Sequence, residues 1–436
     1  MANEENAVRI ARGFSDYVGK VRLFRPNARL YLLSAILTGL GFGVYRLLFN
    51  FYILSQGYAE GFLGLLITVS SVVALAGALP AGFVSDWLGR KPAFLLSAIL
   101  LTLATVGVVV WRTPASFVLM NVLMGLAQCL IGVTGAPFLM ENSGNEERSY
   151  IFSFSFGIQT VAAFVGNWLG GRLPAWLGAL GGFSPTDTEA YGWSILAVAG
   201  VYALALAPLA LIKRRRARRD TTPVFAPFQY ALRQPRLLAR LISPMLVTAL
   251  GAGLLMPFMN VFYRNVYQRS DASIGTLFAV GSLAMGIGLL IAPPIAERYG
   301  KIRLVVLSQA ISIPFLFLMG FAPWYWLSAL AYLIRLVLMN MSGPVYQAFV
   351  MEQVEPDARA TVASLNSMSW NFGWAFSPQL SGWLQENYGF APVFWGTGIT
   401  YTLATLMYQR FFAQQDAPQP TAPCTPAYSQ PSRKHR

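Results

Sequence analysis

Two arginines lie inside long apolar segments, where a charged side chain is costly. Arg46 occurs in FGVYRLLFN and Arg335 in YLIRLVLMN, and none of the 18 acidic residues falls near the middle of an apolar segment to neutralise them. A charge at such depth usually serves function. A cavity with unpaired arginines favours anionic, zwitterionic or polar neutral ligands and repels lipophilic cations. A structural alternative stays open, in which the arginines bond carbonyl or asparagine oxygens and only hold helices together.

Groups for covalent catalysis are missing at this depth. An intramembrane enzyme would need a nucleophile with a base, or a set of metal ligands, and the one histidine, His435, lies near the C-terminus. Cys129 and Cys424 fall in different parts of the chain, so neither a disulfide nor a metal site is indicated. We therefore expect no enzymatic activity, no metal and no other cofactor.

The elements that carry these residues are predicted to be membrane-spanning helices. Hydrophobic residues make up 55% of the 436 residues and charged residues 11%, against about 25% charged in soluble domains. The apolar residues form blocks of about 20, the length a helix needs to cross a bilayer. The sequence thus predicts an all-α membrane protein with twelve spans, at about 30–55, 62–84, 92–111, 115–140, 150–170, 193–212, 238–263, 274–296, 303–321, 324–350, 360–384 and 391–412.

The distribution of positive charge predicts the orientation of the chain. The formal net charge is +14, yet most of the 32 Lys and Arg residues fall in alternate loops and at the two ends, including the run KRRRARR at 213–219. The positive-inside rule then places both termini in the cytoplasm of a multi-pass protein of the cell membrane. The basic run is interpreted as a topology anchor that contacts anionic lipid, and nucleic-acid binding is not expected.

A short charged loop occurs twice, which indicates an internal duplication. GFVSDWLGRK at 82–91 is repeated 211 residues later by PPIAERYGKI at 293–302. A parallel repeat of two six-helix halves is typical of secondary transporters, whose binding site lies near the midplane between the halves. The same shift relates Asp86 and Glu297, Gly89 and Gly300, Arg90 and Lys301, Gly64 and Gly275, Glu141 and Glu352, Arg148 and Arg359, and Gly171 and Gly382.

The predicted domain organisation follows from this repeat. A cytoplasmic N-terminal segment (1–29) precedes a six-helix bundle (30–212), a basic cytoplasmic linker (213–237) and a second six-helix bundle (238–412). Residues 413–436 are rich in Pro, Gln and Ser and are predicted to form a disordered cytoplasmic tail.

The repeated loop resembles the signature loop of the major facilitator superfamily, through Gly82, Asp86, Gly89 and Arg90. The resemblance extends over about residues 30–412 and implies two six-helix bundles that rock about a central cavity, alternately open to each side. It also implies that Asp86 holds the two bundles together on the inside when the transporter opens outward. Gly89 is expected to permit a tight turn.

Further gating residues are expected in the other loops. Glu141 and Arg148 are predicted to form an ion pair between two helix ends, and Glu352 and Arg359 repeat that arrangement in the second half. Exposed pairs are worth at most about 1 kcal/mol, which suits contacts that must break in every transport cycle. Capping of the helix ends is the alternative. Glu297 carries only a remnant of the signature and is expected to be a weaker latch than its counterpart in the first half.

A second resemblance lies in the fifth predicted span. Gly157, Gly166, Asn167, Gly170 and Gly171 resemble the motif G-x8-G-P-x-x-G-G of drug:proton antiporters, with asparagine in place of the proline. The resemblance implies proton-linked export. Close helix packing through small residues is the alternative interpretation.

The superfamily resemblance also indicates which spans line the cavity, namely the first, fourth, seventh and tenth. These spans would bring both arginines into it. The expected substrate-binding residues are Arg46, Asn50, Asn121, Gln128, Asn260, Arg335, Asn340 and Trp370, with Gln159, Asn366, Asn371 and Trp374 as further candidates.

A secondary transporter is the function that these observations favour. We expect a monomer in the lipid bilayer that moves a small organic solute by alternating access, and the motif of the fifth span favours efflux with protons as the coupling ion. The alternative is uptake or exchange of an organic anion bound by the buried arginines.

Overall fold

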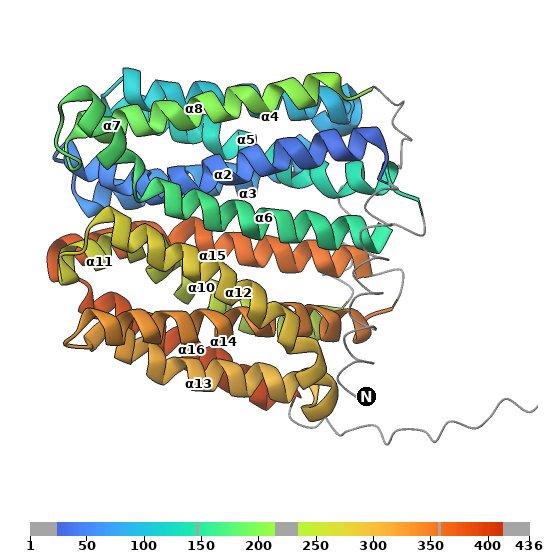
Figure 1. Ribbon diagram of the computed structural model, residues 1–436. Coiled ribbons are helices and arrows are strands. Elements are labelled where there is room, and N and C mark those ends of the chain that lie inside the picture. Colours follow the sequence, from blue (N-terminus) through green and yellow to red (C-terminus); the bar gives the residue numbers. More distant parts are fainter. Residues whose placement is uncertain (1–23, 145–147, 214–233, 356–358, 413–436) are drawn as a thin grey trace, which may run out of the picture.

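The computed structural model describes residues 24–144, 148–213, 234–355 and 359–412 (Figure 1). The predicted tail, most of the N-terminal segment and most of the basic linker lie outside these residues.

The helix boundaries fall within a few residues of the predicted blocks, and the short helix α7 was not predicted. The helices are α2 (Pro26–Ser55), α3 (Glu60–Leu88), α4 (Arg90–Val110), α5 (Pro114–Glu141), α6 (Arg148–Gly170), α7 (Leu173–Gly181), α8 (Thr188–Leu211), α10 (Pro235–Leu255), the 3₁₀ turn η1 (Met256–Phe258), α11 (Met259–Tyr267), α12 (Asp271–Tyr299), α13 (Lys301–Phe321), α14 (Tyr325–Glu352), α15 (Arg359–Tyr388) and α16 (Ala391–Phe412).

Local sequence signals explain where several helices begin. Proline occupies the first helical position at Pro26, Pro114 and Pro235, where its missing N–H costs nothing. Thr113 and Ser116 form a capping box at the start of α5. These signals set the boundaries, while the apolar composition between them makes each helix long enough to span.

Nine helical stretches among the described residues are both long and apolar enough to cross a membrane. The seventh of the predicted blocks forms one such stretch, Pro235–Tyr267, although the 3₁₀ turn η1 interrupts its α-helical hydrogen bonding. The helices α6, α15 and α16 complete the twelve predicted spans and run beside the other nine (Figure 1). Their lower apolar content reflects polar side chains such as Gln159 of α6, Asn366 of α15 and Thr405 of α16.

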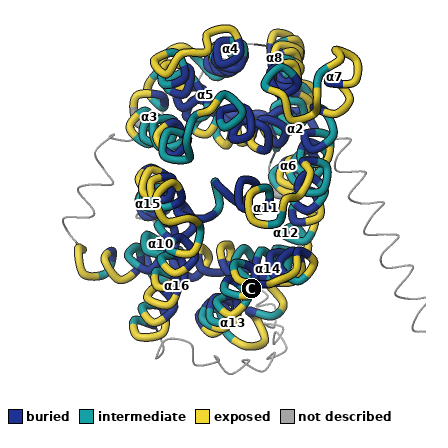
Figure 2. The backbone as a smooth tube through the Cα atoms, turned by 90° about the vertical axis from the view of Figure 1, so that its left-hand side faces the viewer, coloured by how far each residue is buried: buried dark blue, intermediate teal, exposed yellow. Residues whose placement is uncertain are grey.

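The helices form two bundles, α2–α8 and α10–α16, which occupy the upper and lower halves of Figure 1. Figure 2, which looks along the helices, shows the two groups facing each other. The bundles contact each other mainly where α3 packs against α15 and α6 against α12. This arrangement confirms the predicted fold of two duplicated helical bundles.

The two ends of the molecule differ, and we name each by a landmark. The signature end is the end at which α3 meets α4 and α12 meets α13. Gly89 and Gly300 make these two turns with the same φ of 94°, a conformation that favours glycine, so the expectation for Gly89 is confirmed and its repeat mate behaves alike. The α7 end is the opposite end, at which α7 and α11 lie (Figure 1).

Candidate functional site

Backbone contacts at glycines join the bundles, and the duplication makes the same contact twice. A Cβ atom on Gly171, just after α6, would collide with the carbonyl oxygen of Asp271 and lie 3.0 Å from Cα of Gly275. On the other side, a Cβ on Gly382 of α15 would collide with the carbonyl oxygen of Glu60. Since these residues are repeat mates, the glycines that reveal the duplication in the sequence are those that bring the two halves together.

Two hydrogen-bonded amides lie between α2 and α11 toward the α7 end. Asn50 Nδ2 donates to Asn260 Oδ1 (2.8 Å) and to the Pro257 carbonyl (2.7 Å), and Asn260 Nδ2 donates to the Leu47 carbonyl (2.8 Å). Both asparagines are buried. Both are predicted from the sequence to bind substrate, but in this conformation their amides bond across the two bundles and close the α7 end.

A charged contact that sequence reasoning missed joins the bundles at the same end. Arg264 of α11 donates to the Tyr191 hydroxyl of α8 (2.5 Å), forms an ion pair with Asp271 and lies over the ring of Phe51. The Tyr191 hydroxyl donates to the Asp271 carboxylate (2.7 Å). Arg264 is predicted to lie in a loop because the apolar block ends earlier, whereas α11 continues to Tyr267.

Arg46 lies between the bundles, one helical turn inside the amide contact of Asn50. Its side chain is exposed although its neighbours in α2 are buried. The guanidinium carbon is 6.0 Å from the centre of the Trp374 ring in α15. Tyr332 of α14 is close enough to interact electrostatically with both Arg46 and Arg335. The two predicted arginines therefore do approach one region, from opposite bundles.

Arg335 is buried and has no counter-ion among the described residues. It is 1% exposed, and its Nε and Nη2 atoms have no hydrogen-bond partner among the described residues. The guanidinium lies over the Tyr401 ring of α16, 5.2 Å from its centre. Trp374 Nε1 likewise has no partner in the part of the chain that the structure describes. This arrangement favours a binding role for Arg335 over the structural alternative, in which the guanidinium would bond carbonyl or amide oxygens.

Two other predicted ligands are engaged within their own helices. Asn121 donates to the Phe117 carbonyl (2.9 Å) and is buried, and Asn340 donates to the Leu336 carbonyl (2.8 Å). An amide that donates one N–H to its own helix keeps its other N–H and its oxygen for a ligand, but its orientation is fixed by that bond. These residues are therefore weaker candidates than the arginines.

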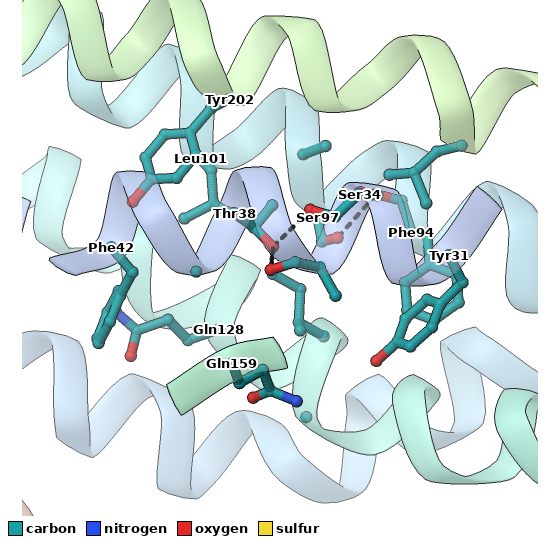
Figure 3. A pocket seen from close by; sticks show the side chains of 16 residues that line it. Tyr31, Ser34, Thr38, Phe42, Phe94, Ser97, Leu101, Gln128, Gln159 and Tyr202 are labelled. Carbon is teal, nitrogen blue, oxygen red and sulfur yellow. Dashed lines mark hydrogen bonds between the residues drawn. The ribbon is translucent and has the colours of Figure 1, made fainter. Parts of the chain in front are cut away.

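Gln128 and Gln159 lie at a cavity of about 280 Å³ in the first bundle, enclosed by α2, α4, α5, α6 and α8 (Figure 3).

Trp370, the remaining predicted ligand, packs near Trp374 on α15, with ring centres 6.3 Å apart. Within the described residues, no three His, Cys, Asp or Glu side chains are grouped to hold a metal ion. The site thus offers cations, amides, hydroxyls and aromatic rings, groups of the kind that can bind an organic solute.

Arg90 organises the signature loop of the first half. Its Nη1 pairs with Asp86 Oδ1 (2.6 Å) and its Nε with Glu141 Oε1 (3.1 Å). Arg90 thus links Asp86 to Glu141 within one bundle. The side chain of Arg148, the predicted partner of Glu141, lies outside the described residues, so its role stays a prediction.

The second half repeats part of this arrangement. Lys301 pairs with Glu352, the contact that the 211-residue shift derives from the pair of Arg90 and Glu141. Arg359 donates to the Met351 carbonyl (2.9 Å), so in this conformation it caps a helix end instead of pairing with Glu352. Lys301 reaches Glu352 because α13 begins directly after the glycine turn, at the end where α14 stops.

The motif of α6 packs on two neighbours. A Cβ on Gly166 or Gly170 would lie 3.1 Å from a Cα atom of α2, so both glycines permit close helix packing. Asn167, which replaces the proline of the motif, donates to Ser282 Oγ of α12 in the other bundle (3.3 Å). Gly157 has open space where a Cβ would lie. The motif therefore serves the interface between bundles as well as packing within one.

Replacing Asp86 with alanine is expected to favour the conformation described here. In this conformation Asp86 is exposed and, among the described residues, pairs with Arg90 of its own bundle, whereas the superfamily resemblance gives it a bundle-to-bundle contact in the opposite state. An exposed pair is worth at most about 1 kcal/mol, so the ratio of the two states should shift about fivefold or less. Labelling of single cysteines from each side of the membrane measures this shift. Unchanged labelling would exclude the role, and Glu297→Ala, at the repeat mate, should have the smaller effect.

Two helical bundles related by an internal repeat, closed at one end over a polar site, are the architecture of a membrane transporter rather than of an enzyme. The family model of the Major Facilitator Superfamily matches residues 31–268 and 243–433. The chain therefore belongs to the Major Facilitator Superfamily.

Individual relatives are distant. The chain is 21% identical, over 394 residues, to the Multidrug resistance protein MdtG of Proteus mirabilis (strain HI4320), which covers 86% of this chain and 92% of that protein. A solved structure of a mutant of the nucleoside transporter NupG matches with a TM-score of 0.73 at 16% identity, over 89% of this chain and 100% of that one. A structure of the D-xylose-proton symporter matches with a TM-score of 0.70 at 17% identity, over 88% and 97%. At these identities the structures establish the fold and not the substrate.

Proposed function

We propose that this chain is a secondary active exporter of small amphiphilic organic solutes, coupled to proton flow in the opposite direction. The observation that carries the proposal is the position of Arg46 and Trp374, a cationic and aromatic pair between the bundles, directly inside a closed end. Two further observations support export. The glycine motif of α6 resembles that of drug:proton antiporters, and the relative MdtG is named a multidrug resistance protein.

The charge distribution orients this conformation in the membrane. If the basic loops face the cytoplasm, the signature end is cytoplasmic and the α7 end faces outward. The contacts of Asn50 with Asn260 and of Arg264 with Tyr191 then close the outer side. A solute would enter from the cytoplasm, bind between the bundles, and leave once these contacts separate. We propose a monomer of the cell membrane with both termini inside.

Everted membrane vesicles give a direct test of export. When the vesicles are energised, addition of an exported amphiphile is expected to dissipate the internal acidification, which a pH-sensitive dye reports. Vesicles without the protein are the control. If no compound in a panel of amphiphiles moves protons in the presence of the protein, proton-linked export is excluded.

A second candidate is uptake or exchange of an organic anion. The absence of a hydrogen-bond partner for Nε and Nη2 of Arg335, among the described residues, favours it. In proteoliposomes without a proton gradient, exchange would appear as accelerated entry of a labelled anion when the same unlabelled anion is loaded inside. Counterflow with no response of the pH dye selects this candidate over the first.

A further inference from the structure

The cavity in the first bundle has an uncharged, partly polar wall. It holds about 280 Å³ and none of its described lining residues carries a charge. Apolar side chains, among them Phe42 and Phe94, form one part of the wall. Hydroxyl and amide groups form the other part, namely those of Ser34, Thr38, Ser97, Gln128, Gln159 and Tyr202 (Figure 3).

Several polar groups of this wall have hydrogen-bonding capacity to spare. The hydroxyl of Tyr202 is fully buried and has no partner among the described residues, and Figure 3 shows it directed toward α2. Gln159 uses its Nε2 to bond Ser155 Oγ (3.3 Å), which leaves its carbonyl oxygen available. A buried polar group without a partner costs about 1–3 kcal/mol, and a ligand that supplies the missing bond recovers this cost.

The cavity leads to the cationic region between the bundles. Phe42 lines the cavity and is 41% exposed, and the exposed Arg46 follows four residues later. Side chains at this spacing share one face of a helix, about 6 Å apart along the axis. That face of α2 therefore runs from the uncharged cavity directly to the guanidinium that approaches Trp374.

We propose that the cavity is the second half of a two-part binding site, and that the transported solutes are amphiphilic organic anions. The anionic group lies at Arg46 and Arg335, and the uncharged, hydrogen-bonding aromatic body lies in the cavity. A volume of about 280 Å³ is at the small end of ligand pockets, which suits one fused ring system rather than a whole drug-sized molecule. The statement about transported solutes rests on the proposed transport function. The two-part site itself is a claim about binding, which can be tested without a transport assay.

Two fluorescent probes that share a ring system separate the two halves of the site. 1-Anilinonaphthalene-8-sulfonate is an anion, and N-phenyl-1-naphthylamine is the same body without the sulfonate. Their binding to the purified full-length protein in nanodiscs is measured against empty nanodiscs, which give the lipid background. Arg335→Gln is expected to lower the affinity for the anionic probe at least tenfold and to leave the affinity for the neutral probe unchanged.

Variants of two open glycines test the cavity itself. Gly132 lines the cavity and Gly200 is exposed on α8, and a Cβ on either would meet nothing within 4 Å. Gly132→Phe is expected to lower the affinity for both probes at least tenfold, and Gly200→Phe is expected to leave both affinities unchanged. Tyr202→Phe removes only the hydroxyl, and an affinity for the neutral probe about two- to threefold weaker supports the site even if Gly132→Phe does not fold.

The outcomes separate this proposal from the transport function. Unchanged binding of the neutral probe to folded Gly132→Phe and to Tyr202→Phe would overturn the cavity site. An equal loss of affinity for both probes in Arg335→Gln would overturn the division of the binding site into two parts. If both binding patterns are found but vesicles show no export, the two-part site stands and the export function fails. If export occurs while the cavity variants bind normally, the cavity proposal alone is lost.

Discussion

Replacing Gly171 with leucine is expected to abolish or strongly reduce transport while both bundles still fold. Any side chain at this position collides with the Asp271 carbonyl and crowds Gly275, so α6 and α12 must separate at the α7 end. Overpacking of this kind costs about 1–3 kcal/mol, and it acts on the conformation in which these helices touch. That conformation should become roughly 5- to 150-fold less populated relative to the other.

Solute uptake into proteoliposomes and cysteine labelling from the α7 side measure the two consequences. Gly382→Leu, at the repeat mate, should reduce transport in the same way, because its side chain would collide with the Glu60 carbonyl where α15 packs against α3. Gly200→Leu is the matched control, since its Cβ would enter open space on α8. Normal transport and unchanged labelling in Gly171→Leu would show that the glycine contact does not govern closure.

Replacing Arg335 with methionine is expected to remove transport without lowering the stability of the protein. The guanidinium is 1% exposed, and the structure gives two of its nitrogens no partner among the described residues. Burying an unpaired ion costs several kcal/mol, so an apolar side chain of similar length should leave the melting temperature equal or raise it. Transport of the solute should fall at least tenfold, because the charge that recognises the anionic group is gone.

The separation of stability from transport makes this result diagnostic. Thermal unfolding of the purified variant and initial rates in proteoliposomes give the two values. Arg46→Met serves as the comparison, since its side chain is exposed and its loss should reduce transport with little effect on melting. A lower melting temperature with normal transport in Arg335→Met would instead assign the residue to helix packing.

Much of the fold was predictable because membrane helices obey one strong constraint. A backbone in hydrocarbon must satisfy its own hydrogen bonds, so blocks of about 20 apolar residues form helices whatever lies beside them. The 211-residue shift then related the halves, and the structure places two glycines that share this register, Gly171 and Gly382, at the interface between the bundles. Burial cost likewise pointed to Arg46 and Arg335 as site residues.

Partners of polar side chains were much harder to predict, because they depend on which helix ends meet in a given conformation. Asn50 and Asn260 have the chemistry of ligands, yet they bond each other across the bundles. Lys301 pairs with Glu352, while Arg359 bonds the Met351 carbonyl, because the glycine turn starts α13 at the end where α14 stops.

By itself, the sequence determined the helical membrane fold, its duplication and the depth of the two arginines, since all three follow from apolar length, repeat register and the cost of burying charge. Tertiary structure alone decided that the α7 end is the closed one, that Arg264 of the second bundle bonds Tyr191 of the first there, and that α2, α4, α5, α6 and α8 enclose an uncharged cavity. The physical reason is that these features arise between helices distant in the chain, where packing of whole bundles sets which groups meet.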